Sequence, residues 1–253
     1  MNSNQTIALA NITPKYIKDN YLTGLVLCGA NGEELPDSFY ETKLAVAAAK
    51  LSELTNVDVF ETVRVGEAHD YYVNDYLRYG FFQLFHQPTR SVEAIRAMYG
   101  NQTNQVYPSN WVRLDMAHSQ INLVPYSGSI AQVAGIADYL PFYTQGFVPG
   151  LWQIDYTSGF DPENIPLLVA DAVCKLAVID MLTVMSNLVG PIGVNSQSLS
   201  VDGLSQSRSY QLPAFKAMLG QYQGDLFGTP GSPTSGLIKQ IKDNYFGIGL
   251  ASL

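Results

Sequence analysis

The residues of this sequence that could do chemistry do not stand at the spacings that common catalytic and binding motifs require. There is no GxxxxGK[ST] phosphate-binding loop, no GxGxxG dinucleotide fingerprint, no HExxH zinc motif and no CxxC pair. The histidines His69, His86 and His118 lie far apart, without neighbours spaced as metal ligands. The adjacent pair His69-Asp70 makes no site by itself, so we interpret these histidines as strand or surface residues.

Serine and aspartate side chains offer two weaker possibilities. The serine-rich run from Ser198 to Ser209 contains VDGLSQS, which lacks the GxSxG pattern of a nucleophile elbow. Asp155 and Asp161 flank a turn and suggest a carboxylate pair or a cation site, but a cation site needs further oxygen ligands at fixed spacing. The sequence therefore predicts a protein that is not an enzyme and that holds no metal ion and no cofactor.

The composition is that of a packed protein without a basic surface. The chain has 253 residues, of which 47% are hydrophobic and 14% charged, and its formal net charge is −8. A protein that grips nucleic acid presents a basic face, whereas the stretch between Arg113 and Lys175 carries six acids and no lysine or arginine. Cys28 and Cys174 are far apart, which argues against a disulfide framework and indicates a reducing cytoplasm.

The longest apolar stretch, residues 165–189, predicts a central helix with Pro166 in its first turn and a Gly-Pro pair after its end. Asp171 and Lys175 share one face as an i,i+4 ion pair, and Asp180 lies roughly opposite. These charges would each cost on the order of 2.5 to 3.5 kcal/mol at the centre of a bilayer, so we expect no membrane span. A helix that is apolar nearly all round instead needs protein partners on more than one side.

The overall pattern predicts an α+β fold, in which a helical core carries an inserted antiparallel β-rich domain and extended terminal arms. Period-two alternation predicts strands in VFETVRV, GFFQLF, SVEAIRAMY, WVRLDM and QINLVPY, and a further strand in LWQIDYTSGF. The expected organisation is an N-terminal arm ordered by contact with something else (1–36), a first core helix (37–57), the β-rich insertion (58–160), the central helix with a serine-rich hairpin and a following helix (161–227), and a linker with a C-terminal docking tail (228–253).

The serine-rich segment is a candidate contact with a neighbouring subunit. Leu199, Val201 and Leu204 alternate with serines around the turn signal Asp202-Gly203, which predicts a hairpin or an extended loop. The segment has too few apolar groups to form its own core. It could add to a neighbouring subunit through backbone hydrogen bonds and its apolar anchors, or remain a flexible loop.

Two further segments carry large apolar side chains without an evident core. A long Gly/Pro-punctuated loop over residues 128–150 suggests a subunit contact. The amphipathic tail beyond the linker either docks in a groove on a partner or folds back onto its own domain. The loop residues are Tyr139, Phe142, Tyr143 and Phe147, and the tail residues are Leu237, Ile238, Ile241, Tyr245 and Phe246.

The order of these pieces resembles the head–tail connector proteins of tailed bacteriophages, which are also called adaptor or head-completion proteins. The matching pieces are DYTSGF, the Ile165-Pro166 helix start and SLSVDGLSQSRS, together with HDYYVNDYLRYGFFQLFHQPTRSVEAIRAMYGNQ and NWVRLDMAHSQINLVPYSGS upstream. The resemblance covers roughly residues 37 to 210. The sizeable β-rich insertion and the tail after residue 227 depart from a minimal member of the family.

The resemblance implies a structural protein of the virion neck that is made in the bacterial host cytoplasm. It would form a dodecameric homo-oligomeric ring that joins the portal to tail or neck proteins, and viral DNA would pass through its channel without specific binding. An acidic wall would repel DNA and let it slide. We then expect the tail residues at the portal, and Asp171, Lys175, Asp180, Leu199, Val201 and Leu204 at subunit interfaces.

The sequence is also consistent with two other classes of protein. One is a different virion protein, such as a capsid-stabilising or tail-completion factor, which its location in the particle would reveal. The other is a carbohydrate-binding β module on a helical base, suggested by Trp111, Trp152 and the many tyrosines. Titration with glycans would discriminate this second class.

Overall fold

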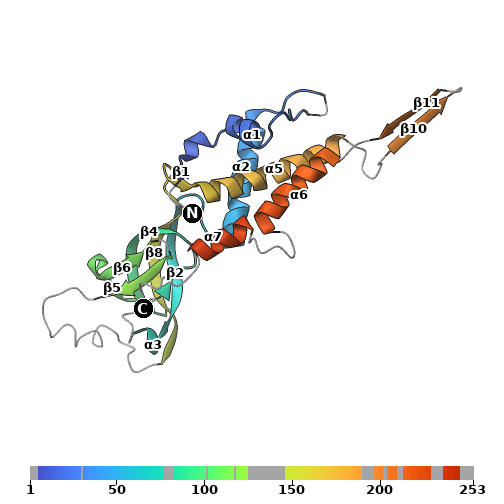
Figure 1. Cartoon of the computed structure of the whole chain (residues 1–253). Coiled ribbons are helices and arrows are strands. Elements are labelled where there is room, and N and C mark those ends of the chain that lie inside the picture. The colour runs from blue at the N-terminus through green and yellow to red at the C-terminus, as the bar shows by residue number, and fades with distance from the viewer. Residues whose placement is uncertain are drawn as a thin grey trace. The chain divides into compact units, whose positions relative to one another are not determined.

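The chain forms two compact units (Figure 1). The computed structural model describes residues 5–29, 31–76, 82–100, 102–116, 118–124, 146–189, 196–201, 204–209, 213–228 and 236–245. We call residues 1–55 with 162–241 the helical unit, and residues 56–161 with 242–253 the β unit. The fold class is mixed α+β, with antiparallel sheets, as the sequence predicts.

The helical unit is organised around α5 (Leu167–Val189), which packs against both α2 (Asp37–Thr55) and α6 (Pro213–Phe227). Buried positions on α5 extend around the helix, and Cys174, Ala177, Val178 and Met181 are fully buried. This arrangement confirms that the apolar helix needs partners on more than one side. The remaining elements of this unit are β1 (Thr6–Ile7), a 3-10 turn (Leu9–Asn11), α1 (Pro14–Asn20), β9 (Ile165–Pro166), β10 (Ser196–Val201) and β11 (Leu204–Ser209); α7 (Leu237–Tyr245) crosses the division between the units.

The part of residues 1–36 that the structure describes folds onto its own unit, and an arm that is ordered by contact with another protein stays a prediction. The Thr13 hydroxyl accepts the Tyr16 N–H at 3.2 Å and caps α1. Ile17 and Leu22 are fully buried, and Leu27 is nearly so. Burial of these apolar side chains stabilises the packing of this region. The glycines and prolines spaced along it gave no sign of such a buried element in the sequence.

Pro166 stands just before the central helix rather than in its first turn. Ile165 and Pro166 form β9, which pairs with Thr6 and Ile7 of β1, and α5 begins at Leu167. The N-terminal strand thus holds the entry of the central helix in place.

The β unit consists of two antiparallel sheets, with strand orders β2-β8-β4-β5 and β3-β7-β6. The core between them is made of Tyr71, Ile95, Trp152, Ile154 and Tyr156 from the first sheet, with Leu84 and Ile121 from the strands and loops of the second. The elements are β2 (Thr62–Tyr72), α3 (Val73–Tyr76), β3 (Phe82–Gln83), β4 (Thr89–Tyr99), β5 (Gln102–Tyr107), a 3-10 turn (Ser109–Trp111), β6 (Val112–Asp115), β7 (Gln120–Leu123) and β8 (Phe147–Ser158).

The strand predictions are correct in type but not in extent. The structure places strands at or within each of the six predicted segments, but in the described part of GFFQLF the strand β3 ends at Gln83, and β2 runs on to Tyr72. β5 (QTNQVY) has no counterpart among the predictions, because its polar sequence lacks the apolar alternation of a half-buried strand. It is ordered by pairing with β4, where Ile95 lies opposite Tyr107.

Candidate functional site

The serine-rich segment forms a hairpin whose strands pair without a register shift. β10 and β11 are antiparallel, with pairs running from Ser196↔Ser209 to Val201↔Leu204, and only two residues separate the strands in the sequence. Leu199 stands opposite Gln206. Because opposite residues and alternate residues share a face, Leu199, Val201 and Leu204 occupy one face near the connected end. The predicted hairpin is confirmed, and it brings these three residues together.

Asp171 and Lys175 form the ion pair that their spacing predicts, with Lys175 Nζ 2.9 Å from Asp171 Oδ2. The same Nζ lies 2.9 Å from Asp225 Oδ2 of α6. The Tyr21 hydroxyl donates to Asp171 Oδ1 at 2.9 Å, and the Tyr222 hydroxyl donates to the Tyr21 carbonyl at 2.8 Å. These partners belong to the same chain, so the group ties α5, α6 and the N-terminal region together. A role in a subunit interface stays a prediction.

Burial and charge shift the pKa of several groups in this cluster. Burial lowers the pKa of Lys175, but its hydrogen bonds with Asp171 and Asp225 outweigh burial and raise the pKa above the ordinary 10.5. Burial is also the main cause that raises the pKa of Tyr21, with added contributions from Cys174 and Asp171. Burial raises the pKa of the Cys174 thiol to about 12. At neutral pH Lys175 is therefore charged, while the phenol and the thiol are neutral.

We expect Lys175→Met to lower the free energy of unfolding of the helical unit by about 1 to 3 kcal/mol, because Asp171 and Asp225 lose their shared cation. A lysine with a raised pKa contributes stability that is fully present below pH 10.5 and is lost as the pH rises through the folded-state pKa. The difference between wild type and variant should therefore shrink in strongly alkaline solution. Urea unfolding followed by far-UV circular dichroism at several pH values measures both effects.

The exposed Lys216 of α6 provides the matched control. Lys216→Met makes the same chemical change without removing a shared ion pair, and should alter stability by less than about 0.5 kcal/mol. Equal losses for the two variants would contradict a stabilising role for the Lys175 cluster.

Asp180 is the third charged residue predicted at an interface on the central helix. Lys50 Nζ of α2 lies 2.6 Å from Asp180 Oδ2, and the two side chains are 48% and 27% exposed. An ion pair with this exposure contributes about 0 to 1 kcal/mol. It links α2 and α5 of one chain, and contact with a neighbouring copy stays a prediction.

The described tail residues pack on the chain itself. Ile241 of α7 is fully buried, while Leu237 and Ile238 are half-buried. The Tyr245 ring meets the Phe160 ring edge-on, with centroids 5.2 Å apart. Phe246 lies outside the described residues. Docking on a portal stays a prediction, and it would have to displace or add to these contacts.

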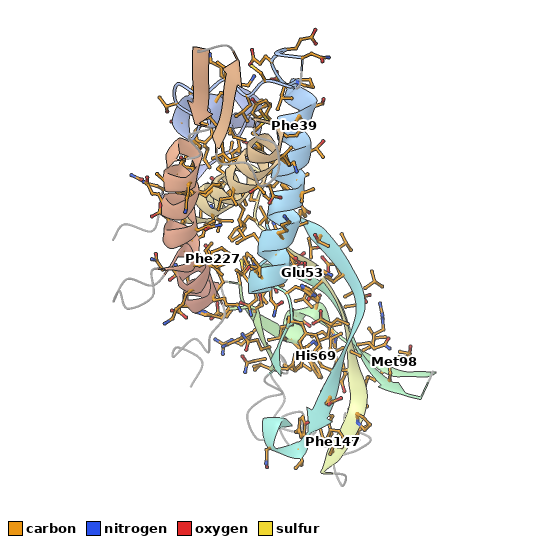
Figure 2. All side chains as sticks on the ribbon, turned by 90° about the vertical axis from the view of Figure 1, so that its right-hand side faces the viewer. Phe39, Glu53, His69, Met98, Phe147 and Phe227 are labelled. Carbon is orange, nitrogen blue, oxygen red and sulfur yellow. The ribbon has the colours of Figure 1, made fainter. Side chains whose placement is uncertain are left out.

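Of the predicted aromatic loop contacts, the structure describes Phe147. This residue begins β8 and does not lie in a loop, which corrects its predicted location, while its contact with another subunit stays a prediction. Phe147 pairs with Tyr72 of β2, and their ring centroids are 5.0 Å apart. Figure 2 shows Phe147 at the end of the β2–β8 pair. Pro149 and Gly150 are residue types typical of turns and loops, but here both lie within the strand β8. Tyr139, Phe142 and Tyr143 lie outside the described residues.

Sequence reasoning missed a buried polar cluster around Glu67 of β2. Its carboxylate accepts the Tyr156 hydroxyl at 2.5 Å and the Phe85 N–H at 3.1 Å, and its Oε1 is 2.7 Å from His69 Nε2. The ring of His69, which is labelled in Figure 2, stacks on Phe82 and on Phe85, and the ring centroids are 5.8 and 4.5 Å away. Period two places Glu67 and His69 on the same side of a strand, so alternation was the available signal.

Three of the described acids between Arg113 and Lys175 are bound to basic side chains. Arg96 binds Asp155 through both guanidinium nitrogens, one of them 3.2 Å from Oδ1, and the Gly66 N–H donates to the same oxygen at 2.8 Å. Asp115 Oδ2 lies 3.0 Å from His118 Nδ1. With Asp171 bound to Lys175, Asp115, Asp155 and Asp171 each have a histidine, arginine or lysine partner.

Across the described ranges, no group of three or more His, Cys, Asp or Glu side chains is arranged to hold a metal ion. None of the helices in those ranges combines the length and apolarity needed to cross a membrane. The two Asp side chains that suggested a cation site, Asp155 and Asp161, do not belong to any such group.

No protein-family model and no curated protein sequence matches this chain. Among solved structures, it is similar to a chain from the virion of a native gene transfer agent particle, with a TM-score of 0.41, 16% identity and coverage of 87% of this chain and 93% of that one. The chains from the neck of an empty particle, computed with C6 symmetry, and of a native particle, computed with C12 symmetry, have TM-scores of 0.40 and 0.39 and identities of 16% and 17%, with the same coverage. These three structures are thus a virion and two necks of gene transfer agent particles.

Proposed function

We propose that this chain is a structural subunit of the neck of a tailed-phage-like particle, where it forms a homo-oligomeric ring that joins the portal to the tail. The observation that carries the proposal is the order of strand β8, apolar helix α5 and hairpin β10–β11. That is the order of the pieces that resemble the head–tail connector family. The role is one of assembly rather than catalysis.

In this proposal each unit has a distinct task. The helical unit supplies a rigid frame, because α5 is buried against α2 and α6. The hairpin supplies the contact with the neighbouring copy. The tail residues of α7 and the aromatic residues near β8 are the candidates for contacts with portal and tail proteins. Viral DNA passes through the ring without specific binding, which suits a chain with a net charge of −8.

The mass of the purified protein, alone and mixed with portal protein from the same particle, tests this function. We expect a ring, either in the free protein or only on the portal. Electron microscopy of particles labelled on this chain should then show it at one vertex. A monomer that does not bind the portal protein, or a label spread over the whole capsid, would contradict a location in the neck. Either result would favour another virion component.

The apolar face of the hairpin should be needed for assembly. Replacing Leu199, Val201 and Leu204 together with aspartate puts three charges per copy on this face, and we expect it to abolish the ring while the monomer stays folded. Mass measurement reports assembly, and far-UV circular dichroism with urea unfolding reports the fold. Loss of the monomer fold would show that these residues belong to an ordinary core.

A second triple variant controls for added charge. Thr42, Ala45 and Ala49 are exposed on α2, so their joint replacement by aspartate changes the net charge equally without touching the hairpin. This control should assemble. If it fails as completely as the hairpin variant, general electrostatic repulsion rather than the hairpin face explains the loss.

The structure removes part of the basis for a carbohydrate-binding role. Trp152, one of the two tryptophans that suggested it, is 2% exposed. Its ring packs against Tyr107 and Phe82, with centroids 5.4 and 5.9 Å away. A ring held in the core cannot offer its face to a sugar, so we do not propose this function.

A further inference from the structure

The register of the β10–β11 hairpin separates its residues into two chemically different faces. Serine stands opposite serine in three pairs, so six hydroxyl residues share one face. The other face carries the remaining pairs, in which the only charged residue is Arg208. The serine pairs are Ser196↔Ser209, Ser198↔Ser207 and Ser200↔Ser205, and the others are Gln197↔Arg208, Leu199↔Gln206 and Val201↔Leu204.

The same register determines which backbone groups are left for a partner. A two-residue connection makes Val201 and Leu204 the pair that exchanges hydrogen bonds within the hairpin. Hydrogen-bonded and non-hydrogen-bonded pairs alternate along an antiparallel ladder. The three serine pairs are therefore the non-hydrogen-bonded ones, and their N–H and C=O groups face outward along the two outer edges of the hairpin.

These edges lack the features that protect an exposed strand from pairing. Natural edge strands carry charges, prolines or bulges, and β2, at the edge of the four-stranded sheet, has two register shifts and the charged residues Arg64, Glu67 and Asp70. The hairpin has no proline, no register shift and one charge in its twelve strand residues. A two-stranded hairpin is also only marginally stable in water by itself.

We propose that the hairpins of adjacent copies pair edge to edge, with β11 of one copy against β10 of the next, so that they close into a continuous antiparallel β-barrel. The inference rests on the proposed ring function and specifies which surface joins the copies. Repeated head-to-tail contacts generate a ring, and neighbouring hairpins that point the same way make every new strand pair antiparallel. Closure leaves no open edge. The barrel wall has a serine face and a face with an apolar band.

Charge favours this pairing over a symmetric one. β10 is uncharged and β11 carries only Arg208. Pairing β11 with a neighbouring β10 therefore opposes arginine to an uncharged strand in every register. Pairing β11 with β11 would put two arginines into one short ladder, where like charges destabilise. The partner that fits each edge is thus the opposite edge of a second copy.

Disulfide trapping between two variants tests the contact directly. In a Cys28→Ser background, one variant carries Ser198→Cys in β10 and the other Ser207→Cys in β11. We expect dimers that contain one copy of each variant when the two are mixed, assembled and oxidised, and none when either is oxidised alone. The series Ser196→Cys and Ser200→Cys against Ser205→Cys and Ser209→Cys then gives the register.

A proline variant tests the same edge without a cross-link. Ser207→Pro removes an outward N–H and spares the hydrogen bonds within the hairpin, which is the condition under which an edge strand tolerates proline. Association should weaken by about tenfold or more per contact, with the circular dichroism of the monomer unchanged. Ser207→Ala keeps the N–H and is the matched control, which should assemble like the wild type.

The outcomes separate this inference from the proposed function. A ring of normal mass that gives no mixed disulfide in any combination and tolerates Ser207→Pro would overturn the barrel and leave the neck ring standing. Copies that never associate, alone or on a portal, would overturn both. Mixed disulfides together with selective loss of assembly in the proline variant would establish the barrel.

Discussion

Replacing Gly159 with alanine should destabilise the β unit by about 3 kcal/mol or more, since it combines a steric clash with backbone strain. Gly159 follows β8 with φ +104°, and a Cβ there would lie 2.2 Å from the Phe60 carbonyl oxygen and 2.9 Å from the Glu61 nitrogen. The Gly159 N–H also donates to the Pro88 carbonyl at 2.8 Å. The atoms nearest to an added Cβ are therefore backbone atoms, which cannot move aside to relieve the clash as the end of a flexible side chain could.

Gly150 offers a control that isolates the clash from the strain. It also has a positive φ, +59°, but nothing lies within 4 Å of an added Cβ. Gly150→Ala should thus cost only about 1 to 2 kcal/mol. Tryptophan fluorescence during urea unfolding reports on the β unit alone, because Trp111 and Trp152 both lie in it. Similar losses in the free energy of unfolding of the two variants would contradict the close approach of Gly159 to the Phe60 backbone.

Glu67→Gln should lower the free energy of unfolding of the β unit by about 2 to 3 kcal/mol. The carboxylate side chain is only 11% exposed, and it accepts the Tyr156 hydroxyl and the Phe85 N–H beside His69. An amide of the same shape offers one acceptor oxygen instead of two and turns an NH2 group toward donors. At least one buried donor then loses its partner, and the charge-assisted bonds become neutral ones.

The pH dependence of stability distinguishes loss of this carboxylate from a general packing defect. Burial raises the pKa of Glu67, but the hydrogen bonds from His69, Tyr156 and the Phe85 N–H outweigh it, so the net shift is downward from 4.5. Such a group contributes stability that is present above pH 4.5 and is lost as the pH falls through the lowered folded-state pKa. Wild type should thus lose more stability than Glu67→Gln on acidification.

Glu93→Gln provides the comparison for this second prediction. Glu93 Oε1 also accepts two side-chain hydrogen bonds, from Ser91 at 2.6 Å and Thr157 at 2.8 Å, but the residue is exposed. Water can replace what the substitution removes, so the loss should stay below about 1 kcal/mol. Acid titrations of both variants that run parallel to the wild type would show that Glu67 does not carry the predicted pH dependence.

Local patterns in the sequence were enough to predict the central helix and the hairpin. The apolar run that forms α5, the i,i+4 pair Asp171–Lys175 and the turn signal that separates β10 from β11 each act over a few residues. Such signals depend on backbone geometry that every chain shares. The α+β class followed from them, because period two and period 3.6 alternate along the chain.

These local patterns did not predict which distant strands pair with one another. β8 is the last strand of its sheet in the sequence, yet it pairs with both β2 and β4, and this placement brings Tyr156 to Glu67 and Asp155 to Arg96. β5 is ordered by β4 rather than by its own composition. Sequence spacing does not indicate which distant strands will meet, so the polar clusters of the β unit could not be foreseen.

By itself, then, the sequence determined the apolar helix, its charged pair and the two-faced hairpin, since residues close in the chain interact through fixed helical and strand periods. Only the tertiary structure decided that the N-terminal region packs on its own unit, that Asp180 binds Lys50, and that Gly159 lies against the Phe60 backbone. These contacts join residues far apart in the chain, and which of them form depends on how the whole apolar surface is buried at once.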